Sequence, residues 1–411
     1  MQLGLSRDGR LLFAARIVRM FGYGSIAVIL VLYLARLGLD GVAIGLVLSL
    51  TLVGDTVISL WLTTHADRLG RRRILIIGAV LMALAGVLFA ATDVFALLLV
   101  AATIGVISPS GNEVGPFLAV EQASLSHTIE DRRRTHVFAW YNLAGSVATA
   151  VGALAAGLIV TGVEAAGFDD LAGYRFVMLV YAALGLGIAA LFSRVSAAVE
   201  VSAPADTTVA RRLGLHRSRN TVLGLSGLFA LDAFAGGLVM QSILAFWFHQ
   251  TYGVSEALLG AIFFAANLLA AGSALAAARI AARIGLVNTM VFTHLPSNVL
   301  LILVPLMPNL PLAIALLLAR FSISQMDVPT RQSYTMAVVA PDERSAAAGV
   351  TGIARSIGAA LSANLAGPLV ATPALAALPF LIGGGLKIVY DLLLWVAFKA
   401  RPTPEETATR G

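Results

Sequence analysis

The feature that most constrains this chain is a series of long apolar runs that recurs from one end to the other. The hydrocarbon core of a bilayer is about 30 Å thick, and a helix needs about 20 apolar residues to cross it. The runs lie at 11–35, 41–62, 74–92, 95–122, 136–160, 174–193, 220–248, 257–278, 287–306, 310–339, 346–370 and 375–398. Because 59% of the 411 residues are hydrophobic and only 12% are charged, we expect an all-α membrane protein with twelve transmembrane helices.

The charges between the runs predict how the chain crosses the membrane. If the N-terminus is cytoplasmic, the cytoplasmic segments carry nearly all of the Lys and Arg outside the spans, and the opposite side carries only Arg36 and Arg175. This is the asymmetry of the positive-inside rule. It predicts a multi-pass protein of the cell (inner) membrane with both termini in the cytoplasm. The formal charge of +6 then reflects topology, and no nucleic-acid partner is expected.

An internal repeat relates the two halves of the chain. Residues separated by 212 to 215 positions recur in matching contexts. The pairs are Gly38 with Gly253, Gly45 with Gly260, 68–70 with 283–285, Ser108 with Ser322, Glu113 with Asp327, and Asp131 with Glu343. The stretch 194–219 between the halves is polar and rich in arginine. We therefore expect two pseudo-symmetric six-helix bundles, 1–193 and 220–411, joined by a cytoplasmic linker at 194–219.

The loop between spans two and three carries a recognisable motif. It reads T-T-H-A-D-R-L-G-R-R-R and resembles the pattern Gly-x-Leu-Ala-Asp-Arg-x-Gly-Arg-Arg/Lys of the major facilitator superfamily (MFS). Thr63 and His65 depart from that pattern. Together with the repeat, the resemblance covers essentially the whole chain. It implies the MFS fold and a bacterial secondary transporter, of the drug/proton antiporter type, rather than an enzyme.

The resemblance also implies a cytoplasmic gate at this loop. In the family the motif's aspartate faces the start of span eleven, where a carboxylate is stabilised by the free N–H groups of the helix. The motif's arginine reaches an acid at the inner end of span four, for which Glu121 is the candidate. The alternative is that Glu121 is a solvated charge at a helix end. The expected gate residues are Asp67, Arg68, Gly70, Arg71 and Glu121.

Ionisable residues inside the spans are the strongest functional signal. Such residues are costly in a bilayer and usually serve function. They are Arg16, Arg19, Asp55, Glu113, Asp232, Arg320, Asp327, Arg331, Arg355, Lys387 and Asp391. In the family, spans one, four, seven and ten line the central cavity, and most of these residues lie on those four spans. Lys387 and Asp391 are spaced to pair with each other on one helix, which favours a structural role.

From these residues we predict a site for proton coupling. Asp55 and Glu113 are expected to be the protonatable pair that faces Arg16 and Arg19, and the opposite half contributes Asp232, Asp327 and Arg331. A permanent ion pair of Asp55 or Glu113 with a span-one arginine is the alternative. For Asp327 and Arg331, a local ion pair is as compatible with their spacing as a substrate contact.

Two of the predicted spans carry signals of interruption. Span four contains S-P-S-G-N-E-V-G-P at 108–116, and two prolines and two glycines in nine residues predict a kink or a break. Glu113 lies inside this stretch. Its repeat partner Asp327 precedes Pro329 in span ten. We therefore expect twin carboxylates beside twin breaks, which would form a pseudo-symmetric gate or site, unless the break is only a packing kink.

Other chemistry has little support in the sequence. The absence of cysteine excludes disulfides and thiolate sites, and the chain has no phosphate-binding Gly-Lys-Ser/Thr loop. We expect no cofactor, no metal site and a monomer whose partners are a small molecule, protons and lipid. The favoured function is proton-coupled efflux by alternating access. The alternatives are a proton-coupled importer or organic-anion exchanger, and a receptor that kept the fold without transport.

Overall fold

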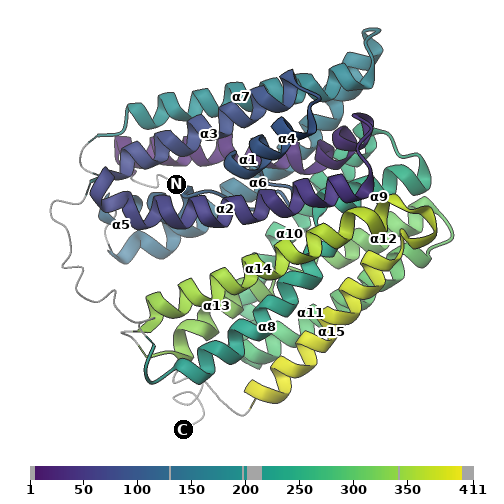
Figure 1. The fold of residues 1–411 in the computed structure, drawn as a ribbon. Helices are drawn as coiled ribbons and strands as arrows, with labels where there is room; N and C mark the ends of the chain where they lie inside the picture. Colours follow the sequence, from purple (N-terminus) through teal and green to yellow (C-terminus); the bar gives the residue numbers. More distant parts are fainter. Residues whose placement is uncertain (1–4, 129–130, 197–198, 201–214, 341–342, 400–411) are drawn as a thin grey trace. The chain divides into compact units, whose positions relative to one another are not determined.

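The computed structural model describes residues 5–128, 131–196, 199–200, 215–340 and 343–399, and most of these residues are helical (Figure 1). Contacts between helices divide the chain into two compact units. The first unit comprises Met1–Ala205 and Met240–Phe264, and the second comprises Asp206–Val239 and Ala265–Gly411. The predicted division into bundles at 194–219 stays a prediction.

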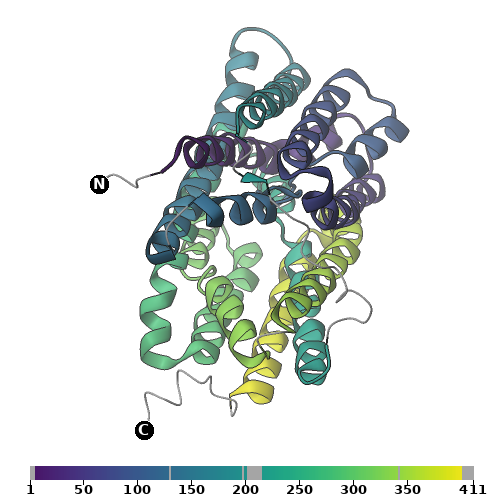
Figure 2. The same ribbon diagram turned by 90° about the vertical axis from the view of Figure 1, so that its left-hand side faces the viewer.

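The first unit is built around helix α1. Its elements are α1 (Arg7–Arg36), α2 (Gly41–Leu69), α3 (Arg71–Ala91), α4 (Phe95–Ile104), α5 (Phe117–Thr128), α6 (Asp131–Ala165), α7 (Asp170–Ser193), α9 (Gln241–Tyr252) and the start of α10 (Glu256–Ile284). In α1, 83% of the apolar segment is buried, compared with 33% in α2 and 50% in α3. Helix α1 packs along α6, α7 and α9 (Figures 1 and 2). It is therefore the core of this unit and can hold charged groups away from lipid.

The second unit is organised around α8 and α11. Its elements are α8 (Arg219–Leu238), the rest of α10, α11 (Leu286–Leu303), the short 3₁₀ helix Val304–Leu306, α12 (Leu310–Phe321), α13 (Asp327–Val338), α14 (Arg344–Ala371), the 3₁₀ helix Pro373–Leu375 and α15 (Leu378–Phe398). Helix α8 packs on α14 and α15, and α11 packs on α12, α13 and α15. Helices that carry ionisable residues of the spans thus pack on one another inside this unit.

The predicted spans agree with the helices, and the fold is the predicted all-α membrane architecture. Among the described residues, ten helical segments are long and apolar enough to cross a membrane. The other two predicted spans, four and ten, are each divided into two short helices. The breaks at 105–116 and 322–326 confirm the interruptions that the sequence predicted. A third break, at Val239–Met240 in span seven, was not predicted, because that stretch contains no proline.

The internal repeat is visible in the backbone of four glycines. Gly38 and Gly253 end corresponding helices and have φ of 82° and 64°, and Gly70 and Gly285 join corresponding helix pairs with φ of 94° and 86°. Left-handed backbone of this kind favours glycine, because a Cβ atom would be strained there. The glycine of the loop motif is therefore needed for the turn between α2 and α3, in addition to any role in a gate.

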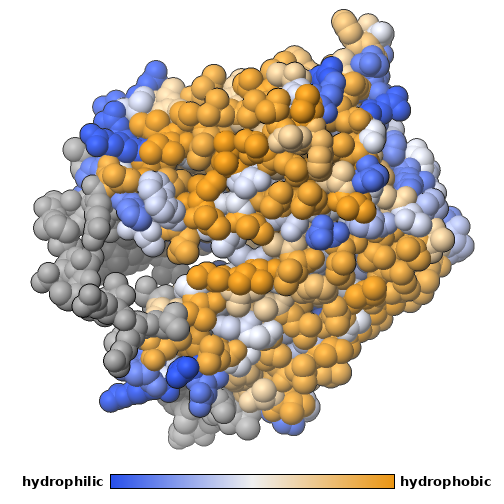
Figure 3. All heavy atoms as spheres, viewed as in Figure 1, coloured by the Kyte–Doolittle hydropathy of each residue, from blue (hydrophilic) through white to orange (hydrophobic). Residues whose placement is uncertain are grey.

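Side chains on the flanks of the helices fit contact with lipid. On α2 the exposed apolar residues include Val57 and Trp61, and on α14 they include Ile357 and Leu361. Figure 3 shows apolar side chains along the flanks of the helices on this face, and hydrophilic side chains mainly near helix ends. Exposed apolar surface of this extent is expected where acyl chains, rather than water, are the solvent.

Candidate functional site

An arginine of α1 lies at the centre of a buried ion network in the first unit. Arg19 has no exposed surface, and its guanidinium donates to both carboxylate oxygens of Glu121 at 2.7 Å. This bidentate geometry is that of a strong arginine–carboxylate pair. Its Nε atom donates to Oε1 of Glu113 at 2.8 Å, and its Cζ atom lies 4.4 Å from the centre of the Phe117 ring. Arg19 is therefore held by two carboxylates and an aromatic face.

Arg16, one turn before Arg19, is the second cation of this network. Its Nη1 atom lies 2.8 Å from Oε2 of Glu113, its Nη2 donates to Asn142 at 3.3 Å, and its Cζ lies 4.3 Å from the centre of the Tyr141 ring. The Nη1–Oε2 contact has the distance of an ion pair but lacks the alignment of a hydrogen bond. Glu113 thus holds Arg16 more loosely than Arg19.

The two glutamates of this network differ in accessibility. The Glu113 side chain is 13% exposed and is shared between two arginines, whereas Glu121 is completely buried and also accepts a hydrogen bond from Tyr141. Glu113 lies beside Arg16 and Arg19 as predicted and forms ion pairs with both, which is also the arrangement of the alternative. Its role in proton coupling stays a prediction. The alternative of a solvated Glu121 is wrong, because a buried carboxylate needs a partner and Arg19 supplies it.

The break in span four positions Glu113. The Gly115 N–H donates to Oδ1 of Asp55 on α2 at 2.6 Å, and the Tyr23 hydroxyl donates to the Val114 carbonyl at 3.1 Å. Ser59 also donates to Asp55, at 3.1 Å. These bonds satisfy backbone groups that the break leaves without helical partners. The described residues show no ion pair between Asp55 and Arg16 or Arg19, so the alternative of such a pair is not the arrangement in this structure.

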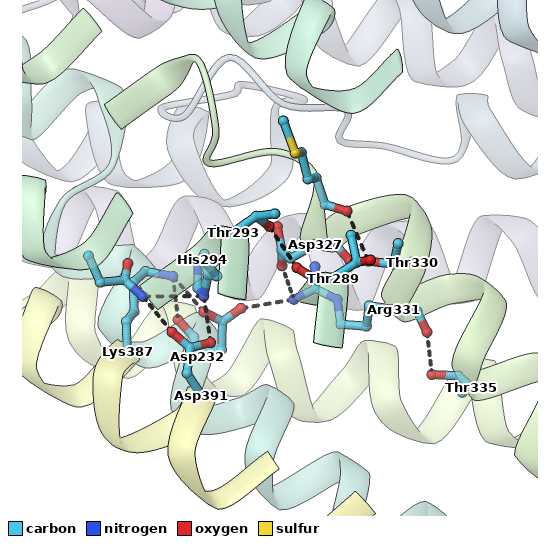
Figure 4. A network of polar contacts seen from close by, with 12 residues as sticks. Asp232, Thr289, Thr293, His294, Asp327, Thr330, Arg331, Thr335, Lys387 and Asp391 are labelled. Atoms are coloured by element: carbon cyan, nitrogen blue, oxygen red, sulfur yellow. Dashed lines mark hydrogen bonds and ion pairs between the residues drawn. The ribbon is translucent and has the colours of Figure 1, made fainter. Parts of the chain in front are cut away.

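A second ion network lies inside the second unit (Figure 4). Asp232 on α8 accepts from Arg331 of α13 at 2.9 Å and from Lys387 of α15 at 2.5 Å. Arg331 also lies 3.2 Å from Asp327, one turn earlier on the same helix. The sequence placed Asp232, Asp327 and Arg331 in one site, and these contacts bring them together. The local pairing of Asp327 with Arg331 is present as well.

Lys387 and Asp391 do not pair as their spacing suggested. Lys387 bonds to Asp232, whereas Asp391 contacts His294 of α11 at 2.9 Å and accepts from Asn298 at 2.9 Å. The prediction of a pair within α15 is wrong, because α8 and α11 offer each side chain a partner across the helix interface. His294 was missed, and its only signal was a polar residue in an apolar run. Among the described residues, no group of three or more His, Asp and Glu side chains could hold a metal ion.

The structure describes the side chains of only some of the predicted gate residues. The backbone of Asp67 and Arg68 belongs to α2, and their side chains lie outside the described residues. The backbone N–H of Arg71 donates to Glu200 at 2.7 Å, and its Nη1 donates to the Val199 carbonyl at 3.4 Å. In this structure Glu121 binds Arg19, and the contact of Arg71 with Glu121 stays a prediction. A gating role for this loop stays a prediction.

A carboxylate at the start of span eleven accepts hydrogen bonds from the backbone just before helix α8. Glu343 is buried and accepts hydrogen bonds from the backbone N–H groups of Arg217 and Ser218, both at 2.8 Å, and from His216. Burial raises the pKa of a carboxylate, but hydrogen bonds from Ser218, His216 and Arg217 outweigh this effect and lower the pKa of Glu343 to about 2. Glu343 therefore stays ionised and caps the beginning of α8.

This cap predicts a pH dependence of stability. The folded pKa of Glu343 is about 2, and a glutamate in the unfolded chain titrates near 4.3. The stabilisation by its charge is complete above the unfolded pKa and is lost as the pH falls through the folded pKa. We expect the melting temperature of Glu343→Gln to be lower than that of the wild type at pH 7 and to fall less steeply below pH ~4.3. Fluorescence melting in detergent measures both, with Asp40→Asn as the control that keeps its cap acceptor. Parallel pH profiles for wild type and Glu343→Gln would contradict this role.

Comparisons with known proteins agree with this architecture. Residues 12–363 match the Major Facilitator Superfamily. The uncharacterized membrane protein YJR124C of Saccharomyces cerevisiae is 31% identical over 423 aligned positions, which cover 96% of this chain and 94% of the yeast protein. Among solved structures, the nucleoside transporter NupG superposes with a TM-score of 0.76 at 16% identity, covering 96% of this chain and 100% of that one. A D-xylose-proton symporter superposes with a TM-score of 0.72 at 15% identity, covering 97% and 98%. The chain therefore belongs to the Major Facilitator Superfamily of membrane transporters.

Proposed function

We propose that the chain is a secondary active transporter that couples the movement of a small molecule to protons, with Glu113 as the proton carrier. The observation that carries this proposal is the shared position of Glu113 between Arg16 and Arg19. Ionisable residues in membrane spans are costly and usually serve a transport pathway or a proton relay. A purely structural pair would need one arginine and one carboxylate, whereas this network has four members.

The charge balance of the network explains how a proton would act. With Glu113 ionised, Arg16 and Arg19 are balanced by Glu113 and Glu121. Protonation of Glu113 leaves one positive charge unbalanced, and it falls on Arg16, whose contact with Glu113 is the poorly aligned one. An unpaired charge in a low-dielectric interior is unfavourable. Proton binding would therefore favour a change that brings water or another anion to Arg16.

Asp55 is a second candidate for the proton. Its carboxylate accepts from Gly115 and Ser59, and among the described residues no lysine or arginine forms an ion pair with it. A carboxylate without a cation in such surroundings is easily neutralised. Protonation there would weaken an acceptor that holds the span-four break. Asp55 would then act on the position of Glu113 rather than on substrate.

The direction of transport follows from how the substrate interacts with Glu113. A cation would compete with the proton for the carboxylate, which gives antiport and hence the efflux predicted from the sequence. An anion would bind Arg16, which protonation of Glu113 leaves unbalanced, and would move together with the proton, which gives symport. We place the protein in the cell membrane, with both termini and 194–219 in the cytoplasm, because its loops follow the positive-inside rule.

Proteoliposomes test the proposal. Purified protein is reconstituted with a pH-sensitive dye inside, and pools of nucleosides, pentoses and organic anions are added outside. These are the substrate classes named for similar folds, a nucleoside transporter, a xylose symporter and an organic anion transporter. We expect one pool to move protons across the membrane, with protein-free liposomes as the control. Solute uptake without proton movement would refute proton coupling, and alkalinisation or acidification of the lumen would give the direction.

A further inference from the structure

The ion network of the second unit holds more cations than carboxylates. Asp232 forms ion pairs with Arg331 and Lys387, and Asp327 forms an ion pair with Arg331. Asp391 contacts His294 and accepts a hydrogen bond from Asn298. Two further arginines of this unit, Arg320 on α12 and Arg355 on α14, form no ion pair with a carboxylate among the described residues. Among the described residues of the spans of this unit, four permanent cations thus accompany three carboxylates.

Arg320 is the buried one of the two arginines that have no carboxylate partner. It is 9% exposed and lies at the end of α12, directly before the break in span ten. Its Nε atom has no hydrogen-bond partner among the described residues, and neither has the buried hydroxyl of Ser324 inside the break. A buried guanidinium without a carboxylate is strongly unfavourable unless something else neutralises it. Two buried polar groups without a partner therefore lie at one helix break, four positions apart in the sequence.

Arg355 is the exposed one of these two arginines. It lies near the middle of α14, eleven residues after the start of the helix, and its side chain is exposed. Within the part of the chain that the structure describes, it forms no ion pair or hydrogen bond. A guanidinium near the middle of a membrane span does not face acyl chains, because desolvation there is too costly. Its exposure therefore points to contact with water, which is where a solute can approach.

We propose that Arg320 and Arg355 bind the anionic group of the transported molecule, a carboxylate or a phosphate. This inference rests on the proposed transport function and adds its substrate class. Arginine suits this role because its planar donors match the oxygens of both groups. The bound anion would neutralise the surplus charge of the network, and Ser324 could donate a further hydrogen bond. A neutral sugar or nucleoside would leave the surplus charge unbalanced.

An anionic substrate also favours one direction of coupling. Protonation of Glu113 adds positive charge to the first unit, and an incoming anion lowers the positive charge of the whole protein. Proton and anion would therefore bind in support of each other and move together. Symport of an anion with a proton is then preferred over the efflux by antiport predicted from the sequence.

Thermal stability of the purified protein tests the anion site independently of transport. A ligand that binds the folded state raises the melting temperature. We expect millimolar phosphate or citrate, compared with chloride at equal ionic strength, to raise the melting temperature of the wild type by about 3 °C or more. The rise should be absent in Arg320→Gln and Arg355→Gln and partly kept in Arg320→Lys. Arg283→Gln, an exposed arginine at the end of α10, is the matched control and should respond like the wild type.

Each result separates this inference from the transport function. No stabilisation of the wild type by either anion, or stabilisation only by uridine or xylose, would overturn the anion site. An equal shift in all variants would show a general salt effect and would overturn it too. Anion stabilisation that depends on Arg320 and Arg355, with no proton movement in liposomes, would keep the site and refute proton coupling. Proton movement without anion stabilisation would keep transport and refute the site.

Discussion

Replacing Glu113 with glutamine is expected to abolish transport driven by a pH gradient while substrate exchange across the membrane continues. Glutamine has the size of a protonated glutamate and keeps an acceptor for Arg19, but it cannot release or take up a proton. The first unit would then be fixed in the state that proton binding normally produces. Gradient-driven uptake and counterflow, measured on the same reconstituted protein, report the two activities separately.

The matched control is Glu164→Gln, at the far end of α6, which should transport like the wild type. Exchange activity shows that the Glu113→Gln protein is folded, so a loss of gradient-driven uptake has one explanation. If Glu113→Gln still accumulates substrate against a gradient, Glu113 is not the proton carrier. The same measurement on Asp55→Asn would then examine the second candidate, because asparagine keeps the acceptor for Gly115.

Replacing Asp232 with asparagine is expected to cause the largest loss of folded protein among single substitutions in the second network. Asp232 is the only carboxylate bonded to Lys387 among the described residues, and it also bonds Arg331. Removing one partner of a buried pair typically destabilises by about 3–5 kcal/mol, because the other charge stays buried without compensation. The double variant Asp232→Asn with Lys387→Met removes both charges and should recover much of this loss.

Melting curves and the monodisperse fraction after detergent extraction measure this pair of effects. Asp93→Asn breaks the exposed pair with Arg175 and should change stability by less than about 1 kcal/mol. A double variant that is no more stable than Asp232→Asn would show that Lys387 does not depend on this carboxylate. Transport by a stable double variant would then tell whether the pair serves folding alone.

The sequence was informative for features that depend only on residues close together along the chain. Long apolar runs, prolines and glycines act locally, so the spans and the breaks at 105–116 and 322–326 could be predicted. The placement of Glu113 near Arg19 could also be predicted, because few partners can neutralise a charge inside a membrane.

Choices between partners could not be read from spacing. Lys387 and Asp391 are one turn apart, yet each bonds to a different neighbouring helix. Glu121 could have bonded several arginines, and its depth beside α1 decided in favour of Arg19. The break in span seven has no proline, so the local sequence gives no signal for it. These features depend on how helices meet in three dimensions, which no single stretch of sequence encodes.

The bond between Gly115 and Asp55 has a consequence for how the chain enters the bilayer. Helix α4 has ten residues, a length of about 15 Å, which is half the thickness of the hydrocarbon core. The break that follows presents amide groups that lipid cannot satisfy. Span four on its own is therefore a poor candidate for insertion, and it becomes acceptable to the bilayer only after α2 is in place to supply the missing acceptor. The order of helices along the chain, with α2 synthesised first, meets this requirement of biogenesis.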